Sequence, residues 1–137
     1  MSNFTEDELE QLLATTEVKP AVNQIQLNPF AHRRALVDAC EGLDIVVEAY
    51  SPLTHGRDLE NPHLVAIAER VGRTPAQVLL RWGLQHGFVV LPKSVNRKRI
   101  EENAEIFDFS LSEEDVEELD ALDRTNGTGK AVEQPWW

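Results

Sequence analysis

The chain has 137 residues, a hydrophobic fraction of 42% and a formal net charge of -11 at pH 7. This length is enough for one domain with its own core, and the apolar content together with only seven prolines argues against disorder. The negative charge argues against a nucleic-acid partner, because phosphate backbones require a broad positive surface.

Neither a membrane span nor a secretion signal is predicted. No run of about 18 apolar residues is present, and the acidic segment Met1–Glu8 lacks the apolar core of a signal peptide. A cytoplasmic protein without membrane attachment is therefore expected. Cys40 is the single cysteine, which excludes an intrachain disulfide and a cysteine metal cluster, and its apolar neighbours predict a buried helical thiol.

In the first half of the chain, helical and strand patterns alternate. The predicted elements are a helix over residues 6–15, a strand over 21–27, a helix over 32–42 and a strand over 44–50. Thr5 and Glu8 form a capping box at the start of the first helix, and Gly42 ends the second. The unbroken Ile45–Val47 run predicts that the second strand is buried on both faces.

The second half carries more helices. The predicted elements are a helix over residues 62–71, one from Pro75 to about Gln85, a strand over 88–91, a helix from Arg97 to about Phe107 and a last helix capped by Ser112. Thr74 and Gln77 supply a second capping box. Residues 123–137 form a tail without periodicity.

The resulting order, αβαβααβαα, predicts parallel strands joined by right-handed crossovers. Three strands are too few for a stable sheet covered by so many helices. The chain is therefore interpreted as a piece of something larger.

A short cationic segment contrasts with the acidic remainder of the chain. Lys93, Arg97, Lys98 and Arg99 fall within seven positions, and Asn96 is a predicted helix N-cap, so three of these cations occupy a first helical turn. Cations are unfavourable there, because free N–H groups give that turn a partial positive charge. Such a placement indicates a phosphate clamp. The alternative is a solvated basic patch that offsets the acidic surface.

Four short segments stand out when they are taken together. They are Ser2–Phe4, Val22–Ile25 followed by Asn28 and Pro29, Ala49–Leu53, and Leu91–Ser94 continuing to Arg99 and Asn103. In this order and spacing they resemble the C-terminal half of an aldo-keto reductase. The resemblance covers nearly the whole chain. It implies a partial TIM (β/α)8 barrel with strands six to eight and their helices, divided into a barrel portion (1–122) and a C-terminal tail (123–137).

The same resemblance implies NADP(H) as cofactor, held in extended form without a Rossmann glycine-rich loop. Ser2, Asn3 and Gln24 match positions that bind the nicotinamide carboxamide, Tyr50 matches the aromatic that stacks on the ring, and Ser51 and Leu53 match the loop beside the pyrophosphate. Lys93, Ser94 and Arg99 match the clamp on the 2′-phosphate, and Glu102 and Asn103 match the adenine contacts. A dianionic 2′-phosphate between two cations would favour NADP over NAD.

The implied activity is NADP(H)-dependent reduction of aldehydes or ketones to alcohols, with a small carbonyl compound as substrate. In the family, the residues that transfer the proton lie in the N-terminal half of the barrel. No catalytic residue is therefore expected in this chain, which is predicted to be inactive alone. The alternative is a non-catalytic nucleotide-binding or assembly relic. Met1 stands where the family usually has an aliphatic residue, which favours a truncated or misannotated reading frame over an evolved half-protein.

Two further expectations concern the histidines and the sheet edges. The four histidines, His32, His55, His63 and His86, have no spacing typical of metal ligands, so surface or capping positions and no metal site are predicted. The strands at 21–27 and 88–91 would be open edges. Open edges of apolar strands invite association, so the isolated chain is expected to self-associate.

Overall fold

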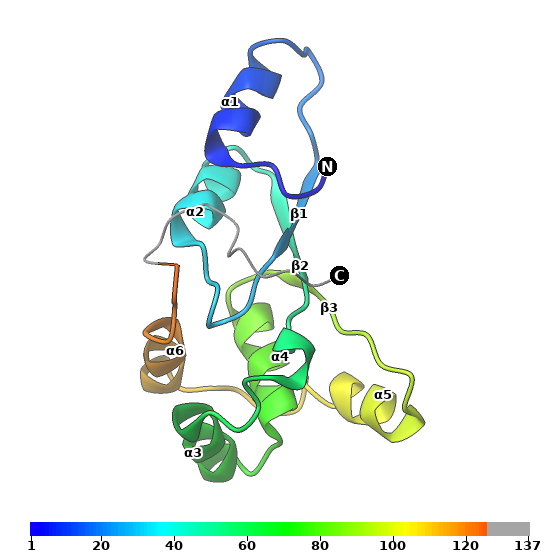
Figure 1. Cartoon of the computed structure of the whole chain (residues 1–137), viewed down its shortest axis with the longest axis vertical. Helices are drawn as coiled ribbons and strands as arrows, with labels where there is room; N and C mark the ends of the chain where they lie inside the picture. The colour runs from blue at the N-terminus through cyan, green and yellow to red at the C-terminus, as the bar shows by residue number, and fades with distance from the viewer. Residues whose placement is uncertain (126–137) are drawn as a thin grey trace.

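The computed structural model describes residues 1–125, and the elements within them follow the predicted order (Figure 1). The helices are α1 (Glu6–Leu13), α2 (Arg34–Gly42), α3 (Pro62–Val71), α4 (Pro75–Gln85), α5 (Arg97–Ala104) and α6 (Glu113–Asp120). The strands are β1 (Val22–Gln26), β2 (Val46–Tyr50) and β3 (Val89–Leu91). One short 3-10 turn, η1 (Thr54–Gly56), was not predicted. Residues 126–137, which include most of the predicted tail, lie outside the described residues.

Local sequence accounts for most helix starts. Capping boxes begin α1, α4 and α6, as the sequence predicted for the first two, and Asn96 caps α5. By contrast, α5 ends at Ala104 rather than near Phe107. The carbonyl of Glu105 accepts a hydrogen bond from Gln77 of α4, and the next residue, Ile106, turns into the core with 3% of its surface exposed. Tertiary contacts therefore end this helix early.

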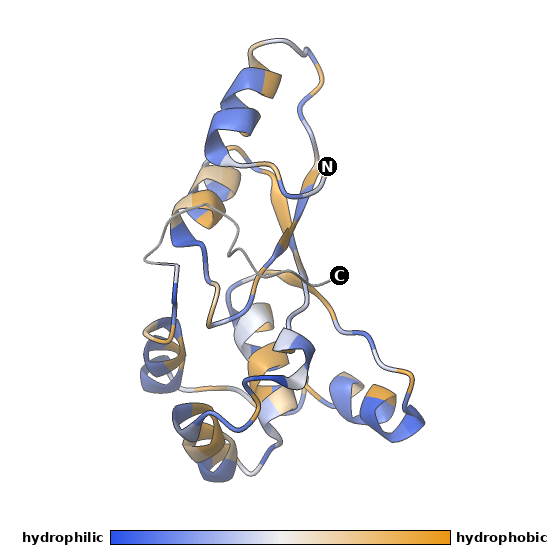
Figure 2. Cartoon of the chain, in the orientation of Figure 1, coloured by the Kyte–Doolittle hydropathy of each residue, from blue (hydrophilic) through white to orange (hydrophobic). Residues whose placement is uncertain are grey.

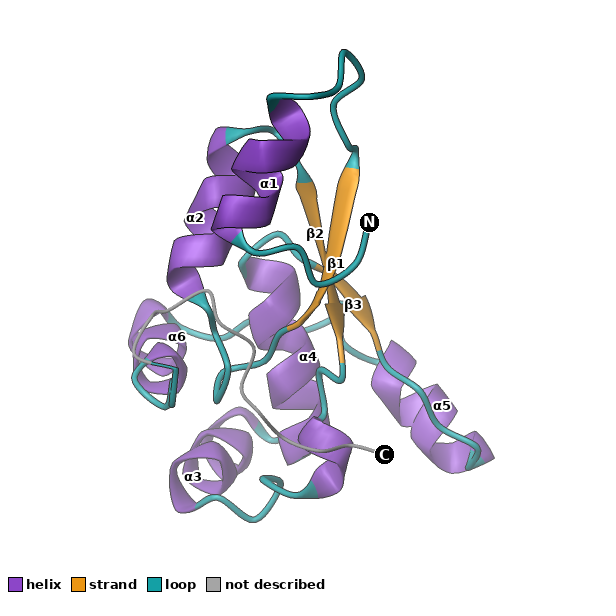
Figure 3. Ribbon diagram, turned by 45° about the horizontal axis from the view of Figure 1, so that its top comes forward, coloured by secondary structure: helices purple, strands orange, loops and turns teal. Residues whose placement is uncertain are grey.

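The three strands form one parallel sheet in the order β1-β2-β3. Parallel pairing agrees with the prediction from the alternating elements. Figures 1 and 3 show α1, α2 and α4 on the same side of the strands, whereas α5 lies beyond β3. The core lies between the sheet and these helices and continues between α4, α3 and α6. Its largest fully buried side chains include Trp82, Leu9, Ile25, Leu27, Leu36, Leu64 and Ile67.

The other face of the sheet corrects one prediction. Ile45 and Val47 are buried, but Val46 is 47% exposed, so β2 is not buried on both faces. Val89 and Leu91 of β3 share this open face and are 42% and 39% exposed. An apolar run therefore predicted burial on a face that no element among residues 1–125 covers. In Figure 2 the strands carry both hydrophobic and hydrophilic colour.

The outer edge of β1 corrects a second prediction. It was expected to be open, yet the first residues of the chain pair with it. The amide of Gln24 donates to the carbonyl of Met1 at 3.0 Å, and the amide of Asn3 donates to the carbonyl of Gln24 at 2.9 Å. Ser2 and Gln24 thus form a parallel bridge. Among the described residues, no strand pairs with the outer edge of β3.

Cys40 is fully buried in α2, as predicted, and burial raises the pKa of its thiol. No helix in the described part of the chain combines the length and the apolar character needed to cross a bilayer.

Candidate functional site

The candidate site lies where β2 and β3 end. Tyr50 and Leu91 are paired neighbours at the last positions of these two parallel strands. The segments that follow them therefore leave the sheet side by side. In parallel sheets, ligands bind outside the carboxyl ends of the strands.

The loop after β2 is held in an unusual backbone conformation. Ser51, Thr54 and His55 have φ angles of 50°, 51° and 54°, a left-handed region that is uncommon for residues other than glycine. Local contacts hold this shape. The Ser51 hydroxyl lies 3.0 Å from Nε2 of His55, and buried Thr54 accepts the amide of Asp58 at 3.1 Å. Strained backbone of this kind clusters at ligand sites.

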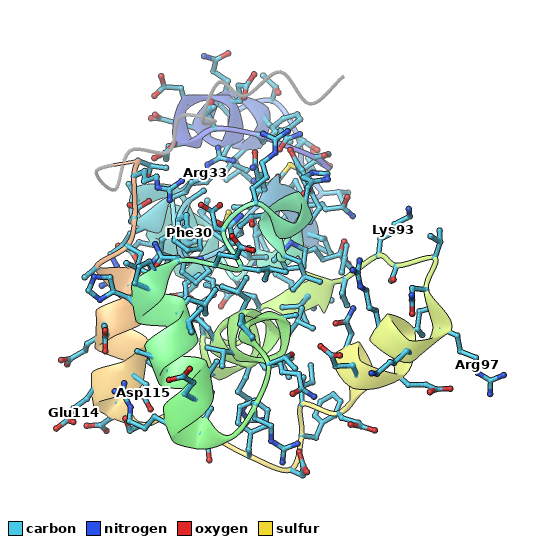
Figure 4. The ribbon with its side chains drawn as sticks, turned by 60° about the horizontal axis from the view of Figure 1, so that its bottom comes forward. Phe30, Arg33, Lys93, Arg97, Glu114 and Asp115 are labelled. Carbon is cyan, nitrogen blue, oxygen red and sulfur yellow. The ribbon has the colours of Figure 1, made fainter. Side chains whose placement is uncertain are left out.

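The segment after β3 presents the predicted cations. The Ser94 hydroxyl accepts the amide of Asn96 at 3.1 Å, and the Asn96 side chain accepts the amide of Arg99 at 3.3 Å. Arg97 points away from the molecule (Figure 4), and its guanidinium pairs with Glu101 at 2.9 Å. Within residues 1–125, the ion pairs involve neither Lys93 nor Arg99.

These two loops and α5 enclose a pocket of about 550 Å³. Six predicted site residues line it, namely Leu53, Lys93, Ser94, Arg99, Glu102 and Asn103. A smaller hollow of about 130 Å³ adjoins it and is lined in part by Ser51, Leu53 and Lys93. The structure thus brings together seven of the eleven predicted positions. His55 lines both hollows and was not predicted, because only the left-handed turn of its loop places it there.

Contacts with α4 hold the far wall of the pocket. Thr74 donates to the carboxylate of Glu102 at 2.7 Å, and Asn103 is buried. The Gln77 amide donates to the carbonyls of Glu102 and Glu105 at 3.1 and 3.2 Å. The Glu102 carboxylate is therefore already engaged by Thr74.

The remaining four predicted residues meet beside the pocket. Ser2 and Asn3 pair with Gln24 through the backbone, and the Tyr50 hydroxyl donates to Oδ1 of Asn3 at 3.2 Å. The Gln24 amide donates to Glu48 at 2.9 Å. Because Ser51 follows Tyr50 directly, the two groups form one track along the end of the sheet.

A larger hollow, of about 700 Å³, lies on the other side of α5. Its lining carries Glu69, Glu101, Glu102 and Glu105 against Arg73 and Lys98. The four carboxylates in the lining of this larger hollow would repel an anionic ligand. Of the basic segment, Lys98 lines this larger hollow, whereas Lys93 and Arg99 line the smaller pocket.

The prediction for the histidines was wrong at one position. His32 is 3% exposed and packs edge-on against Trp82, with ring centroids 5.0 Å apart. Burial lowers the pKa of His32, although Asp120 acts in the opposite direction. His32 and His86 also meet at Asp120, a grouping that their separation along the chain did not indicate.

Comparisons with known proteins agree with this arrangement. The model of the Aldo/keto reductase family matches residues 1–124. The glyoxal reductase of Bacillus subtilis is 48% identical over 129 residues, which cover 94% of this chain and 47% of that protein. The crystal structure of Gox0644 without ligand is 44% identical, with a TM-score of 0.89, over 95% of this chain and 48% of that one.

Two solved complexes are also similar. A point mutant of Gox0644 in complex with NADPH superposes with a TM-score of 0.88 at 44% identity, over 95% of this chain and 48% of that chain. The aldo-keto reductase of Bombyx mori in complex with NADP gives a TM-score of 0.81 at 32% identity, over 89% of this chain and 43% of that chain. The chain spans about half the length of the curated relatives it matches.

Proposed function

Because the chain belongs to the aldo/keto reductase family, we propose that it supplies the NADP(H)-binding part of a reductase that converts aldehydes or ketones to alcohols. One observation carries the proposal. Lys93 and Arg99 line a pocket of about 550 Å³, and both cations lack a carboxylate partner within the described residues. The NADPH complex of the Gox0644 mutant and the NADP complex of the Bombyx mori aldo-keto reductase support it.

The residues present fit a phosphorylated nucleotide. Lys93, Ser94 and Arg99 are assigned to the 2′-phosphate, because two cations and a hydroxyl suit a dianion. Glu102 and Asn103 are assigned to the adenine, and Ser51 and Leu53 to the neighbouring pyrophosphate. Ser2, Asn3 and Gln24 are assigned to the nicotinamide carboxamide and Tyr50 to its ring.

When bound, the cofactor supplies the hydride that reduces the carbonyl carbon. The residues of this chain bind and orient it, and none is assigned an acid–base role. Tyr50 is the sole tyrosine of the sequence, and its hydroxyl donates to Asn3 at 3.2 Å. The proton donor is assigned to a part of the enzyme that this chain does not include. The isolated chain is accordingly proposed to be inactive.

The fold assignment follows the same proposal. The three strands are assigned to positions six to eight of a (β/α)8 barrel, with residues 1–122 as the barrel portion and 123–137 as the tail. In a closed barrel the open face, with Val46, Val89 and Leu91, would point into the interior. The apolar character of these side chains supports this assignment, because barrel interiors are packed with bulky branched residues.

A second candidate function is a non-catalytic nucleotide-binding or assembly module. Among residues 1–125, the outer edge of β3 has no partner strand and one face of the sheet is uncovered, and both features favour this candidate. Both features would allow association without any turnover.

The direct experiment is a fluorescence titration of the purified chain with NADPH. Saturable binding is expected, and Arg99→Ala should weaken it at least tenfold, since a charge-assisted contact to the phosphate is lost. Arg97→Ala is the matched control, because Arg97 points outward and pairs with Glu101. The affinity of Arg97→Ala for NADPH should equal that of the wild-type chain. NADH should bind wild type and Arg99→Ala equally, because it lacks the 2′-phosphate.

Failure of the folded wild-type chain to bind NADPH would overturn the proposal. If Arg99→Ala and Arg97→Ala lost affinity for NADPH equally, the binding would reflect general attraction by a basic patch and not a specific phosphate contact. Supplying the N-terminal half of a related reductase separates the two functions. Turnover that appears only with both halves supports the reductase, and binding without turnover supports the module.

A further inference from the structure

Three potential metal ligands converge on the side of the molecule formed by α2, α4 and α6. His32 lies just before α2, His86 is the C-cap of α4, and Asp120 ends α6. One ligand atom from each lies within 4.8 Å of the others. Oδ1 of Asp120 is 2.9 Å from Nε2 of His86 and 3.4 Å from Nδ1 of His32.

This donor set has a preferred cation. Two imidazole nitrogens and one carboxylate oxygen are a recurrent set for Zn²⁺, with bonds of about 2.0–2.2 Å. Ligand atoms of a tetrahedral site with such bonds lie about 3.4 Å apart, by the same geometry. Two of the three separations, 2.9 and 3.4 Å, come near this value, and the third is within 4.8 Å.

Surrounding contacts fix the orientation of the three ligands. The indole N–H of Trp82 donates to Oδ1 of Asp120 at 2.7 Å, and Arg34 donates to Oδ2 at 3.2 Å. His86 stacks on Phe88 with an interplanar angle of 11°. Hydrogen bonds to a ligating carboxylate and an apolar wall around the ligands are typical of protein metal sites.

The charges beside the carboxylate leave room for a cation. Arg34 binds the oxygen that faces away from the imidazoles, and its side chain is 57% exposed. Oδ1 keeps a lone pair beside its bond to Trp82. The side chains of His86 and Asp120 are 21% and 20% exposed, which gives an ion in solution access to the cluster.

We propose that His32, His86 and Asp120 form a site for a divalent transition-metal ion, with Zn²⁺ as the best match. The bound ion would join the start of α2 to the ends of α4 and α6, and a water molecule would complete its coordination. The site is distinct from the cofactor pocket, so the proposal is independent of the assigned reductase function.

The test uses the untagged full chain, stripped with a chelator and titrated with Zn²⁺. Calorimetry should give a single site, and saturating Zn²⁺ should raise Tm by about 5–10 °C. His86→Gln retains an amide that can bond to Asp120 but removes the ligand, so this variant should fold and lose the Zn²⁺ effect. His63→Gln is the matched control, because His63 forms an exposed pair with Glu118 at 3.0 Å.

Absence of one-to-one Zn²⁺ binding to the wild-type chain would overturn the proposal. So would a Zn²⁺ effect that survives in His86→Gln, or one that is lost equally in His63→Gln. Co²⁺ provides a second readout. An intense visible spectrum typical of tetrahedral coordination should appear in the wild type and be absent from both His86→Gln and His32→Gln.

Discussion

Gly83 shows how closely one helix approaches the sheet. It lies in α4, and a Cβ atom added there would come within 2.6 Å of Cγ1 of Val90 in β3. The neighbour is a branched side chain held in the sheet, so it has little room to move. This single contact therefore sets how near α4 packs to β3.

We predict that Gly83→Ala lowers the free energy of unfolding by about 1–3 kcal/mol, because the added methyl group overpacks the core. Gly42→Ala is the matched change, since nothing lies within 4 Å of a Cβ at that helical position. It should raise stability by up to about 1 kcal/mol, because alanine favours the helix. Urea denaturation of both variants checks the prediction. Adding Val90→Ala to Gly83→Ala should recover part of the lost stability. If the two substitutions changed the free energy of unfolding additively, the proposed contact between positions 83 and 90 would be contradicted.

The cationic segment shows what sequence alone leaves open at this scale. The sequence correctly placed Arg97 and Arg99 in the first turn of a helix capped by Asn96. The charge pattern alone did not distinguish them, and only the family resemblance selected Arg99, because the rotation of α5 about its axis decides which arginine faces the pocket. Thr74 and Gln77 hold α5 through hydrogen bonds to Glu102, and no local sequence pattern reveals these distant contacts.

At the scale of elements, Gln77 joins two helices. Its amide group donates to the carbonyls of Glu102 and Glu105 and accepts the amide of Thr74 at 3.1 Å. These bonds connect the first turn of α4 to the end of α5. We predict that Gln77→Leu lowers the free energy of unfolding by about 1–2 kcal/mol, because it leaves the partly buried carbonyls of Glu102 and Glu105 without this donor.

The same substitution should weaken NADPH binding if α5 carries the pocket wall, since Arg99 and Asn103 would lose their support. Gln85→Leu is a useful comparison. Its amide donates to the carbonyl of Leu111, away from the pocket, at 3.1 Å. It should reduce stability without changing the affinity for NADPH at a temperature where both variants are folded. If Gln77→Leu and Gln85→Leu changed the affinity for NADPH equally, Gln77 would not support the pocket wall through α5.

Asp115 links α6 to α3. Burial raises the pKa of its carboxyl group, but hydrogen bonds from Arg70 and Ser112 outweigh this effect and hold the pKa below its ordinary value. A lowered folded-state pKa means that the unfolded chain binds the proton more readily. The stabilisation is therefore complete above the ordinary carboxyl pKa of about 4 and is lost as the pH falls below it.

We predict that Asp115→Asn lowers the free energy of unfolding at neutral pH, because the ion pair with Arg70 is lost. The loss should be only about 1–2 kcal/mol, because Arg70 is half exposed. The difference from wild type should shrink as the pH falls below about 4. Denaturation at a series of pH values measures it. Asp108→Asn, at the exposed pair with Arg73, should have little effect at any pH. A difference for Asp115→Asn that does not depend on pH would exclude the carboxylate as its cause.

The sequence predicted best those elements whose ends are fixed by residues close together in the chain. The capping boxes at Thr5 and Thr74 were found because each depends on residues three positions apart. The turn at Thr54–Gly56 and the burial of His32 were not found. The burial of His32 depends on Trp82 and Asp120, which lie far along the chain. The turn is held by local contacts, but its left-handed backbone has no signature in residue spacing.

For the whole molecule, the net charge and the open sheet face have opposite effects on self-association. The face that carries Val46, Val89 and Leu91 favours contact with a second copy of the chain, and the outer edge of β3 has no partner strand among residues 1–125. A net charge of -11 keeps copies apart. Salt screens the repulsion but leaves the apolar attraction intact.

We therefore predict that the chain self-associates and that the association increases with salt. Sedimentation velocity at low and high ionic strength measures it. Val89→Lys places a charge on the edge strand and should shift the chain toward monomer. Val18→Lys is the matched control, because Val18 is 79% exposed and lies away from the sheet, between α1 and β1. A monomer at every salt concentration would contradict the prediction, as would equal effects of the two lysines.

The placement of α5 has a consequence for local opening. Figure 1 shows this helix apart from the main body, and Asn103 is its single buried residue among those described. Its backbone amides should therefore exchange with deuterium sooner than those of α4, which is packed in the core. A phosphate held between Lys93 and Arg99 would bridge the loop after β3 to α5. Cofactor binding should then be visible as slower exchange confined to this helix, with no change in the shape of the fold.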